Sequence, residues 1–201
     1  MNSWLAKITL CVVSRAQCKA NAYERNLSHI EYSISVFMNI LPQFESLLPF
    51  AIAWAKAQET HILQSGESLS EDDKQFARRI GVREIERVRL LRVDAIPFPQ
   101  DEVLGKVARE IGFISPHTLG MALRFGIFVR DDIWRDDVWR DHGIIAHELV
   151  HTAQYERLGF DEFLRAYLTQ CLTVGYANSP LELEAIEVST RAIRAINEPR
   201  A

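Results

Sequence analysis

Three residues with the chemistry of a metal-assisted hydrolysis site stand together in the second half of the chain: His147, Glu148 and His151, in the order H-E-x-x-H. On an α-helix, residues four positions apart lie about 40° apart around the axis, so both imidazoles face the same side. Two converging neutral nitrogens suit Zn2+. Glu148, rotated by about 100° from His147, would lie beside the ion and take a proton from a water molecule. The pattern therefore predicts one Zn2+ per chain with a neighbouring general base.

The alternative interpretation is a helix with two unrelated histidines, either on the surface or hydrogen-bonded in the core. It is disfavoured because four apolar residues assign this helix to the core: Ile144, Ile145, Leu149 and Val150. The other histidines carry no such spacing. His142 precedes His147 by five residues, about 140° away around the helix, so it is not expected to ligate. Surface or capping roles are expected for the remaining three, His29, His61 and His117.

A third metal ligand is expected on a later helix. After a turn at Gly159, a second helix and another turn, residues 181–185 begin a further helix with the sequence LELEA. The two turns would reverse the chain direction twice and return this helix to the two histidines, so Glu182 or Glu184 could reach the metal. The two glutamates differ by about 200° around the axis, so only one can point inward. The alternative is a solvated acidic first turn that offsets the helix dipole.

The segments HELVHTAQYERLG and GYANSPLELEA resemble the gluzincin type of zinc metallopeptidase, especially its small bacterial members, over about residues 119–194. In that family the third ligand begins an E-x-x-[AS]-D pattern. The resemblance implies that Glu182 is the ligand, and that Glu184 supports a ligand or lies at the surface. It also implies a zincin-like fold in which a small sheet lies beside the HExxH helix.

The chain departs from the family pattern at Ile186, where gluzincins carry an acid that orients a ligating histidine. Groups that orient a ligand influence metal affinity, so another group must serve here. Glu184, Asp137 and a backbone carbonyl are the candidates. The departure reduces the expectation of efficient peptidase activity, but not that of metal binding.

Two further features have both a catalytic and a structural interpretation. Gluzincins carry an edge strand beside the metal with which an extended peptide pairs, and residues 125–130 could be that strand or an ordinary core strand. Tyr155 and Tyr176 could donate a hydrogen bond to a developing oxyanion, although packing is the commoner role of such aromatic residues.

The elements that must position these residues follow from apolar spacing and turn residues. Helical spacing extends from about residue 23 to 64, broken or kinked near Pro42 and Pro49. Ser70 and Gly81 are expected to cap a helix between them. Strands are expected at 88–96 and within 120–130, where Gly126 marks a bulge or hairpin, and helices at 101–111, 136–158, 161–174 and 181–197. The prediction is a helix-dominated α+β fold in a single domain, residues 1–201, with an N-terminal scaffold to about 118 and a metallopeptidase-like core over about 119–197.

The composition limits the classes of function. Hydrophobic residues make up 48% and charged residues 25% of the chain, which excludes a disordered chain. The formal net charge is -4, and acidic residues interrupt the arginine cluster at 83–92, so no nucleic-acid partner is expected. No stretch is apolar enough to span a membrane. Residues 4–13 resemble a signal sequence only weakly, and three cysteines without a CxxC pair predict no disulfide framework, so a cytoplasmic location is expected.

Together these observations predict a zinc-dependent metallohydrolase, specifically a peptidase acting on a peptide or protein substrate. His147, His151 and Glu182 would hold the ion, and Glu148 would be the catalytic base. The alternative is a non-enzymatic binding or structural module that keeps a zinc site for stability. The oligomeric state does not follow from the sequence.

Overall fold

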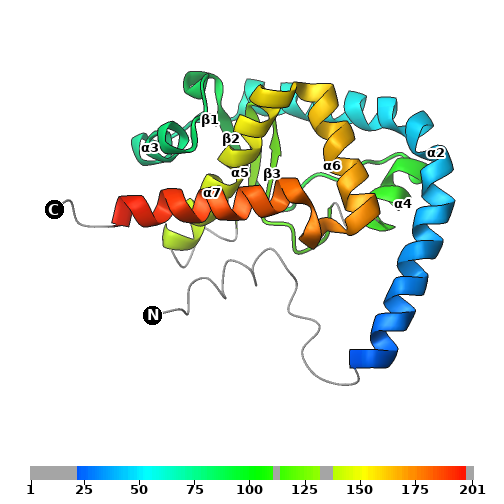
Figure 1. The fold of residues 1–201 in the computed structure, drawn as a ribbon. Helices are drawn as coiled ribbons and strands as arrows, with labels where there is room; N and C mark the ends of the chain where they lie inside the picture. The colour runs from blue at the N-terminus through cyan, green and yellow to red at the C-terminus, as the bar shows by residue number, and fades with distance from the viewer. Residues whose placement is uncertain (1–21, 111–113, 132–137, 198–201) are drawn as a thin grey trace.

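The structure, a computed structural model, describes residues 22–110, 114–131 and 138–197 (Figure 1). Helices predominate, and the strands form one small mixed sheet, which confirms the predicted helix-dominated α+β class. The helices are α2 (Ala22–Ser65), α3 (Glu71–Ile80), α4 (Glu102–Glu110), α5 (Val138–Leu158), α6 (Phe160–Val174) and α7 (Pro180–Asn197). The strands are β1 (Glu67–Ser68), β2 (Arg89–Val93), β3 (Gly120–Leu123) and β4 (Gly126–Arg130).

Local sequence signals set the ends of α3 as predicted. The Ser70 side chain accepts a hydrogen bond from the backbone N–H of Asp73 at 3.1 Å, which satisfies one free amide of the first turn. Gly81 adopts a left-handed backbone with φ of 95° and donates its N–H to the Ala77 carbonyl, ending the helix. The strongest capping signals in the sequence therefore give the right boundaries.

The long N-terminal helix was expected to be broken or kinked near its prolines. The structure has one helix, α2, over Ala22–Ser65, so the helix is not broken. Figure 1 shows its axis changing direction between the blue first part and the cyan second part. The second part packs against β4, α6 and α4, so α2 forms one wall of the fold.

The sheet has the order β1-β2-β4-β3. β2 and β4 are parallel, whereas β3 pairs with β4 in an antiparallel hairpin with Leu123 opposite Gly126. The hairpin interpretation of residues 120–130 is therefore confirmed. β4 lies inside the sheet, so the interpretation of residues 125–130 as an ordinary core strand is confirmed and the edge-strand interpretation is wrong; β3 is the edge strand on that side.

Two apolar clusters lie on the two faces of the sheet, because side chains alternate along each strand. Met121, Leu123 and Phe128 point to a cluster that includes residues of α2 and α6. Ile127 and Val129 point to the other cluster, with residues of α3, α5 and α7. The HExxH helix, α5, is thereby fixed between the edge strand β3 and the C-terminal helix α7.

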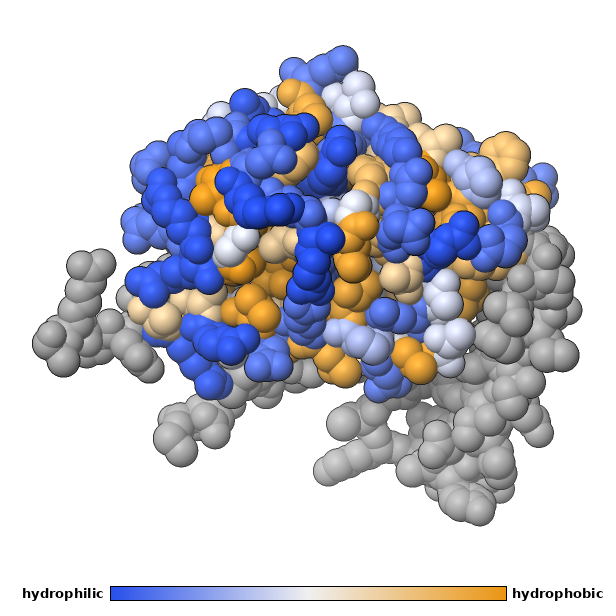
Figure 2. Space-filling model, turned by 45° about the horizontal axis from the view of Figure 1, so that its top comes forward, coloured by the Kyte–Doolittle hydropathy of each residue, from blue (hydrophilic) through white to orange (hydrophobic). Residues whose placement is uncertain are grey.

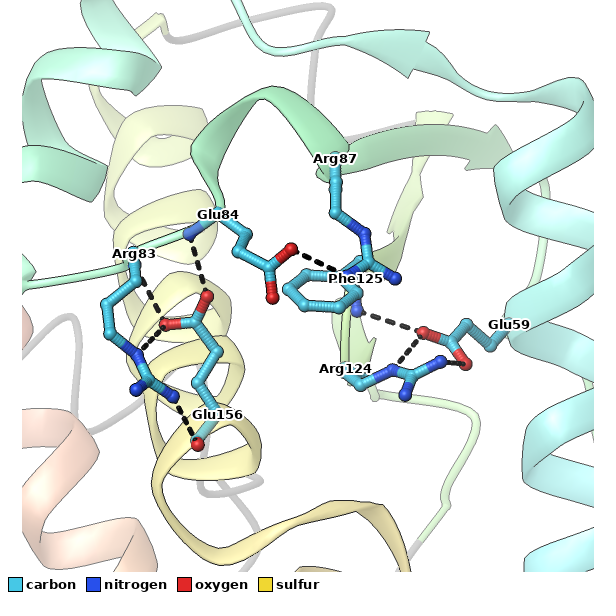
Figure 3. Close-up of polar contacts among 7 residues, drawn as sticks. All are labelled: Glu59, Arg83, Glu84, Arg87, Arg124, Phe125 and Glu156. Atoms are coloured by element: carbon cyan, nitrogen blue, oxygen red, sulfur yellow. Dashed lines mark hydrogen bonds and ion pairs between the residues drawn. The ribbon is translucent and has the colours of Figure 1, made fainter.

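A second attachment of α5 lies near its C-terminal end. The buried Glu156 carboxylate accepts hydrogen bonds from the backbone N–H groups of Arg83 and Glu84, each at 2.8 Å (Figure 3). The Arg83 guanidinium reaches the Glu156 carbonyl. This contact ties the loop before β2 to α5, so the sheet and the helix are joined by polar as well as apolar contacts.

The described surface mixes charges as the sequence predicts. In the arginine cluster, Arg87 pairs with Glu84 at 2.6 Å and Arg92 with Glu67 at 4.0 Å. Figure 2 shows hydrophilic and hydrophobic residues interspersed on one face. Within the described ranges, no helix combines the length and the apolar character that crossing a bilayer requires. Residues 4–13, Cys11 and Cys18 lie outside the described residues.

Candidate metal centre

Helices α5 and α7 bring three potential metal ligands together. The Nε2 atoms of His147 and His151 are 3.2 Å apart. One Glu182 carboxylate oxygen lies 3.3 Å from Nε2 of His147, and the other lies 3.2 Å from Nε2 of His151. All three residues are buried. Of the two glutamates considered from the sequence, the structure thus places Glu182 beside the histidines.

The spacing of these atoms fits a tetrahedral Zn2+ site. Two ligands that each lie about 2.1 Å from Zn2+ at a tetrahedral angle are about 3.4 Å from each other. The three separations of 3.2–3.3 Å are close to this value. Among the buried side-chain atoms that the structure describes, Oε2 of Glu182 has no hydrogen-bond partner. A buried carboxylate oxygen without a partner is costly, and a cation at this point would satisfy it.

The electrostatics of the three residues favour a positive charge between them. Burial opposes a charge on His151, but the Glu182 carboxylate outweighs burial and raises the pKa of His151 to about 9. Burial also penalises the Glu182 carboxylate, but His151 and His147 hold the pKa of Glu182 well below its usual range. The site is therefore an anionic carboxylate facing two imidazoles, an arrangement that either a proton or a metal cation stabilises.

Glu148 lies beside this group on the same helix, and its side chain is also buried. Burial raises the pKa of Glu148, while the charges of His147 and His151 and a backbone hydrogen bond from Ala122 of β3 oppose the increase. A raised carboxyl pKa suits a group that must both accept and return a proton. Glu148 is thus enclosed between the two histidines and the edge strand.

Glu184 points away from the three ligands and contacts Arg157. The Arg157 guanidinium donates to its two carboxylate oxygens at 2.7 and 2.8 Å, and these hydrogen bonds lower the pKa of Glu184. Nε2 of Gln154 also donates to the Glu184 carboxylate, at 3.0 Å. Glu184 was one candidate to orient a histidine, and it reaches His151 only through Gln154. Asp137, another candidate, lies outside the described residues.

Sequence reasoning missed two residues at the centre. Gln154 contacts Nδ1 of His151 at 2.8 Å, and its signal was its position three residues after His151, on the same helix face. The hydroxyl of Tyr167 donates to Oε1 of Glu182. No sequence signal marks Tyr167, because α6 reaches the site only through tertiary packing.

The two tyrosines considered from the sequence differ in their surroundings. Tyr155 is 1% exposed and packs on the Phe163 ring with centroids 3.9 Å apart, so its role is packing. Tyr176 is partly buried; burial first, and then the charge of Glu182, raise its pKa well above 10.0. Of the two tyrosines, Tyr176 is therefore the one whose pKa is raised by the charge of Glu182.

The remaining histidines take no part in the centre as far as the structure describes them. His61 and His117 are exposed, as predicted for surface residues. The side chains of His29 and His142 lie outside the described residues.

No protein-family model matches this chain, and no curated protein or solved structure matches it either. The function is therefore inferred from the motif residues and the geometry of the centre.

Proposed function

We propose that the protein is a zinc-dependent metallohydrolase that cleaves peptide bonds. The observation that carries this proposal is the spacing of His147, His151 and Glu182, which matches a tetrahedral Zn2+ site, with Glu148 beside it. Three protein ligands are the number found in catalytic zinc sites, where a fourth position serves water or substrate. The resemblance to gluzincins agrees with this ligand set.

Bound at these residues, Zn2+ would polarise a substrate carbonyl and make water acidic enough to attack it near neutral pH. Glu148 would accept the proton of the attacking water and donate it to the leaving amine. Its buried position beside the histidines keeps the carboxylate within the site, and its raised pKa favours the return of the proton.

The edge strand β3 supports an extended peptide as the substrate. In the described sheet, β3 pairs only with β4, and it lies against α5 next to Glu148. An edge strand can hydrogen-bond the backbone of an extended peptide, whatever its side chains, and on β3 this leaves the groups other than the Ala122 N–H, which bonds Glu148. This assigns to β3 the role that the sequence suggested for residues 125–130.

Metal content tests the ligand set. Elemental analysis of the purified wild type should give about one Zn2+ per chain, and Glu182→Gln should lose it, because an amide replaces the anionic ligand. Glu187→Gln is the matched control on the same helix, since the Glu187 side chain is 76% exposed and, among the described residues, forms its ion pair with Arg191. Zinc retained in Glu182→Gln, or absent from the wild type, would contradict the proposal.

Hydrolysis of an unstructured peptide mixture tests the reaction. Glu148→Gln should keep its zinc but lose about 100- to 10,000-fold in rate, the usual contribution of a general base. The variant should fold, because burial already favours an uncharged group at this position. Equal rates for the wild type and Glu148→Gln would contradict the role of Glu148.

The enclosure of the centre favours one alternative, a non-enzymatic module that binds zinc for stability. All four residues are nearly inaccessible, with 1–6% of each residue exposed. A structural zinc site needs no access for substrate. A wild type that binds zinc, unfolds earlier with chelator and cleaves no peptide would support the module; peptide cleavage that depends on Glu148 would exclude it.

A further inference from the structure

Gln154 is a buried polar residue whose hydrogen-bonding groups are all engaged. It is 1% exposed and lies one turn after His151 on α5. Its Oε1 lies 2.8 Å from Nδ1 of His151, and its Nε2 donates to the Leu181 carbonyl and to the Glu184 carboxylate, each at 3.0 Å. Gln154 thus connects one ligand on α5 to the first turn of α7.

These contacts fix the orientation of the Gln154 amide. A carbonyl and a carboxylate can only accept hydrogen bonds, so the amide nitrogen must face Leu181 and Glu184. The amide oxygen must then face His151. An amide oxygen only accepts, so Nδ1 of His151 must carry a hydrogen and donate it. In the neutral ring, Nε2 is then the nitrogen with the free lone pair.

This tautomer is the one that a metal at the centre requires. Nε2 of His151 is the nitrogen that faces His147 and Glu182, at 3.2 Å from each. Arg157 holds Glu184 through two hydrogen bonds, and Glu184 in turn holds the amide of Gln154. The chain of contacts from Arg157 to His151 therefore turns Nε2 toward the site, and in the neutral ring this nitrogen has the lone pair that a metal needs.

His147 has no comparable support in the described structure. Its Nδ1 is buried and without a hydrogen-bond partner. The geometry leaves Gln154 as the side chain that holds a ligating histidine through its second nitrogen.

We propose that Gln154 is a positioning residue that sets the tautomer and ring orientation of His151 and thereby the affinity of the centre for Zn2+. This inference rests on the proposed metal-dependent function. Removing a group that orients a ligand typically weakens metal binding by about 10- to 100-fold without removing the site. The same chain of contacts holds the turn that carries Glu182, so a control must separate the two effects.

Gln170 supplies this control. Its Oε1 accepts hydrogen bonds from the Ser179 hydroxyl at 2.7 Å and from the Leu181 N–H at 3.1 Å. Gln170 therefore holds the same start of α7 as Gln154. No contact between Gln170 and a ligating residue is present among the described hydrogen bonds. Matched Leu substitutions at 154 and 170 remove an amide of equal size, and only the first removes the partner of His151.

The test compares the wild type with Gln154→Leu, Gln154→Glu and Gln170→Leu. For each protein, competition with a chromophoric chelator gives the Zn2+ affinity, and the absorption spectrum of the Co2+ form reports the geometry of the ligands. Gln154→Leu should bind about 10- to 100-fold more weakly, with an altered Co2+ spectrum, and still reach about one ion per chain at saturation. Gln154→Glu keeps an acceptor for Nδ1 but sets a carboxylate oxygen against the Leu181 carbonyl and the Glu184 carboxylate, so it should recover part of the affinity and give a spectrum closer to the wild type than that of Gln154→Leu. Gln170→Leu should stay near the wild type in both.

Four results would overturn the inference. Wild-type affinity in Gln154→Leu would show that His151 needs no partner. An equal loss in Gln170→Leu, or no recovery in Gln154→Glu, would show that only the attachment of α7 matters. A wild type that binds neither Zn2+ nor Co2+ would overturn the proposed function and this inference with it. Its lack of metal distinguishes this result from the other three.

Discussion

Gly120 and Glu148 are in such close contact that no side chain fits between them. A Cβ atom built on Gly120 would lie 2.7 Å from Oε1 of Glu148 and 2.9 Å from its Cγ. The backbone of the edge strand β3 therefore forms one wall around the proposed general base. Glycine at this position gives Glu148 the space for the conformation it adopts.

The first prediction follows from this contact. Gly120→Ala should displace the Glu148 carboxylate and reduce peptide hydrolysis by about 10- to 100-fold, because small misplacements of reacting groups are costly. Its zinc content should be unchanged. Gly143→Ala is the control: a Cβ on Gly143 of α5 meets no atom within 4 Å, so this variant should keep full activity. Equal activities of the two variants would refute the prediction.

The second prediction concerns an ion pair at the β3–β4 hairpin in which the carboxylate is buried and the arginine is partly exposed (Figure 3). Arg124, with a φ of 54° in the turn, donates to both oxygens of Glu59 at 2.8 and 2.9 Å, and the side chain of Glu59 is 5% exposed. Arg124→Ala would leave this carboxylate buried with the Phe125 N–H as its remaining partner, so unfolding in urea should become easier by about 3 kcal/mol.

A matched variant isolates the contribution of Glu59. Arg124 and Arg87 both lie over the Phe125 ring, at 5.1 and 4.0 Å from its centroid, but the acidic partner of Arg87, Glu84, is exposed. Arg87→Ala should therefore cost at most about 1 kcal/mol. If both variants lose the same stability, stacking on Phe125, and not the buried carboxylate, is what Arg124 contributes.

The third prediction is that removing the metal destabilises the fold. A free ligand at about a thousandfold above its Kd stabilises a protein by about 4 kcal/mol, roughly 8–16 °C in Tm for a chain of this length. Adding excess chelator to the zinc-loaded wild type should lower Tm by about this amount in a calorimetric scan. Glu182→Gln should show no response to chelator, and a large response would place the stabilising metal elsewhere.

The fourth prediction concerns the thiol of Cys171, which is buried in the core. Burial, and then the charge of Glu182, raise its pKa from 9.0 to about 12. Only the thiolate is nucleophilic, so at pH 8 the folded Cys171 should react with an aromatic disulfide about 1000-fold more slowly than the unfolded chain. The measurement needs Cys11→Ser and Cys18→Ser together, so that Cys171 is the only thiol.

The sign of the pH effect on stability follows from the same shift. The folded state holds the thiol proton more tightly, so the contribution of Cys171 to stability is constant below pH 9 and decreases from pH 9 toward pH 12. In urea unfolding, Cys171→Ala should lose less stability than its parent over this range. Identical pH profiles for the two proteins would rule out the raised pKa.

The sequence by itself determined the features that depend on neighbours along the chain. The H-E-x-x-H spacing places two imidazoles on one face of α5 because helix periodicity is fixed. Ser70 and Gly81 set the ends of α3 because capping is a contact within one turn. The choice of Glu182 over Glu184 needed the family resemblance, since the helix periodicity says only that one of them faces inward.

Only the tertiary structure decided which elements meet at the centre. The sequence places strands at residues 88–96 and 120–130, but strand order depends on pairing between distant segments, so it could not show that β3 is the edge and β4 is interior. Tyr167 contacts Glu182, and the Gln154 amide contacts Leu181 and Glu184, because α6 and α7 fold back against α5. These contacts join residues that are 15 to 30 positions apart in the chain. Apolar periodicity specifies which face of a helix is buried, but it does not specify which element packs against that face.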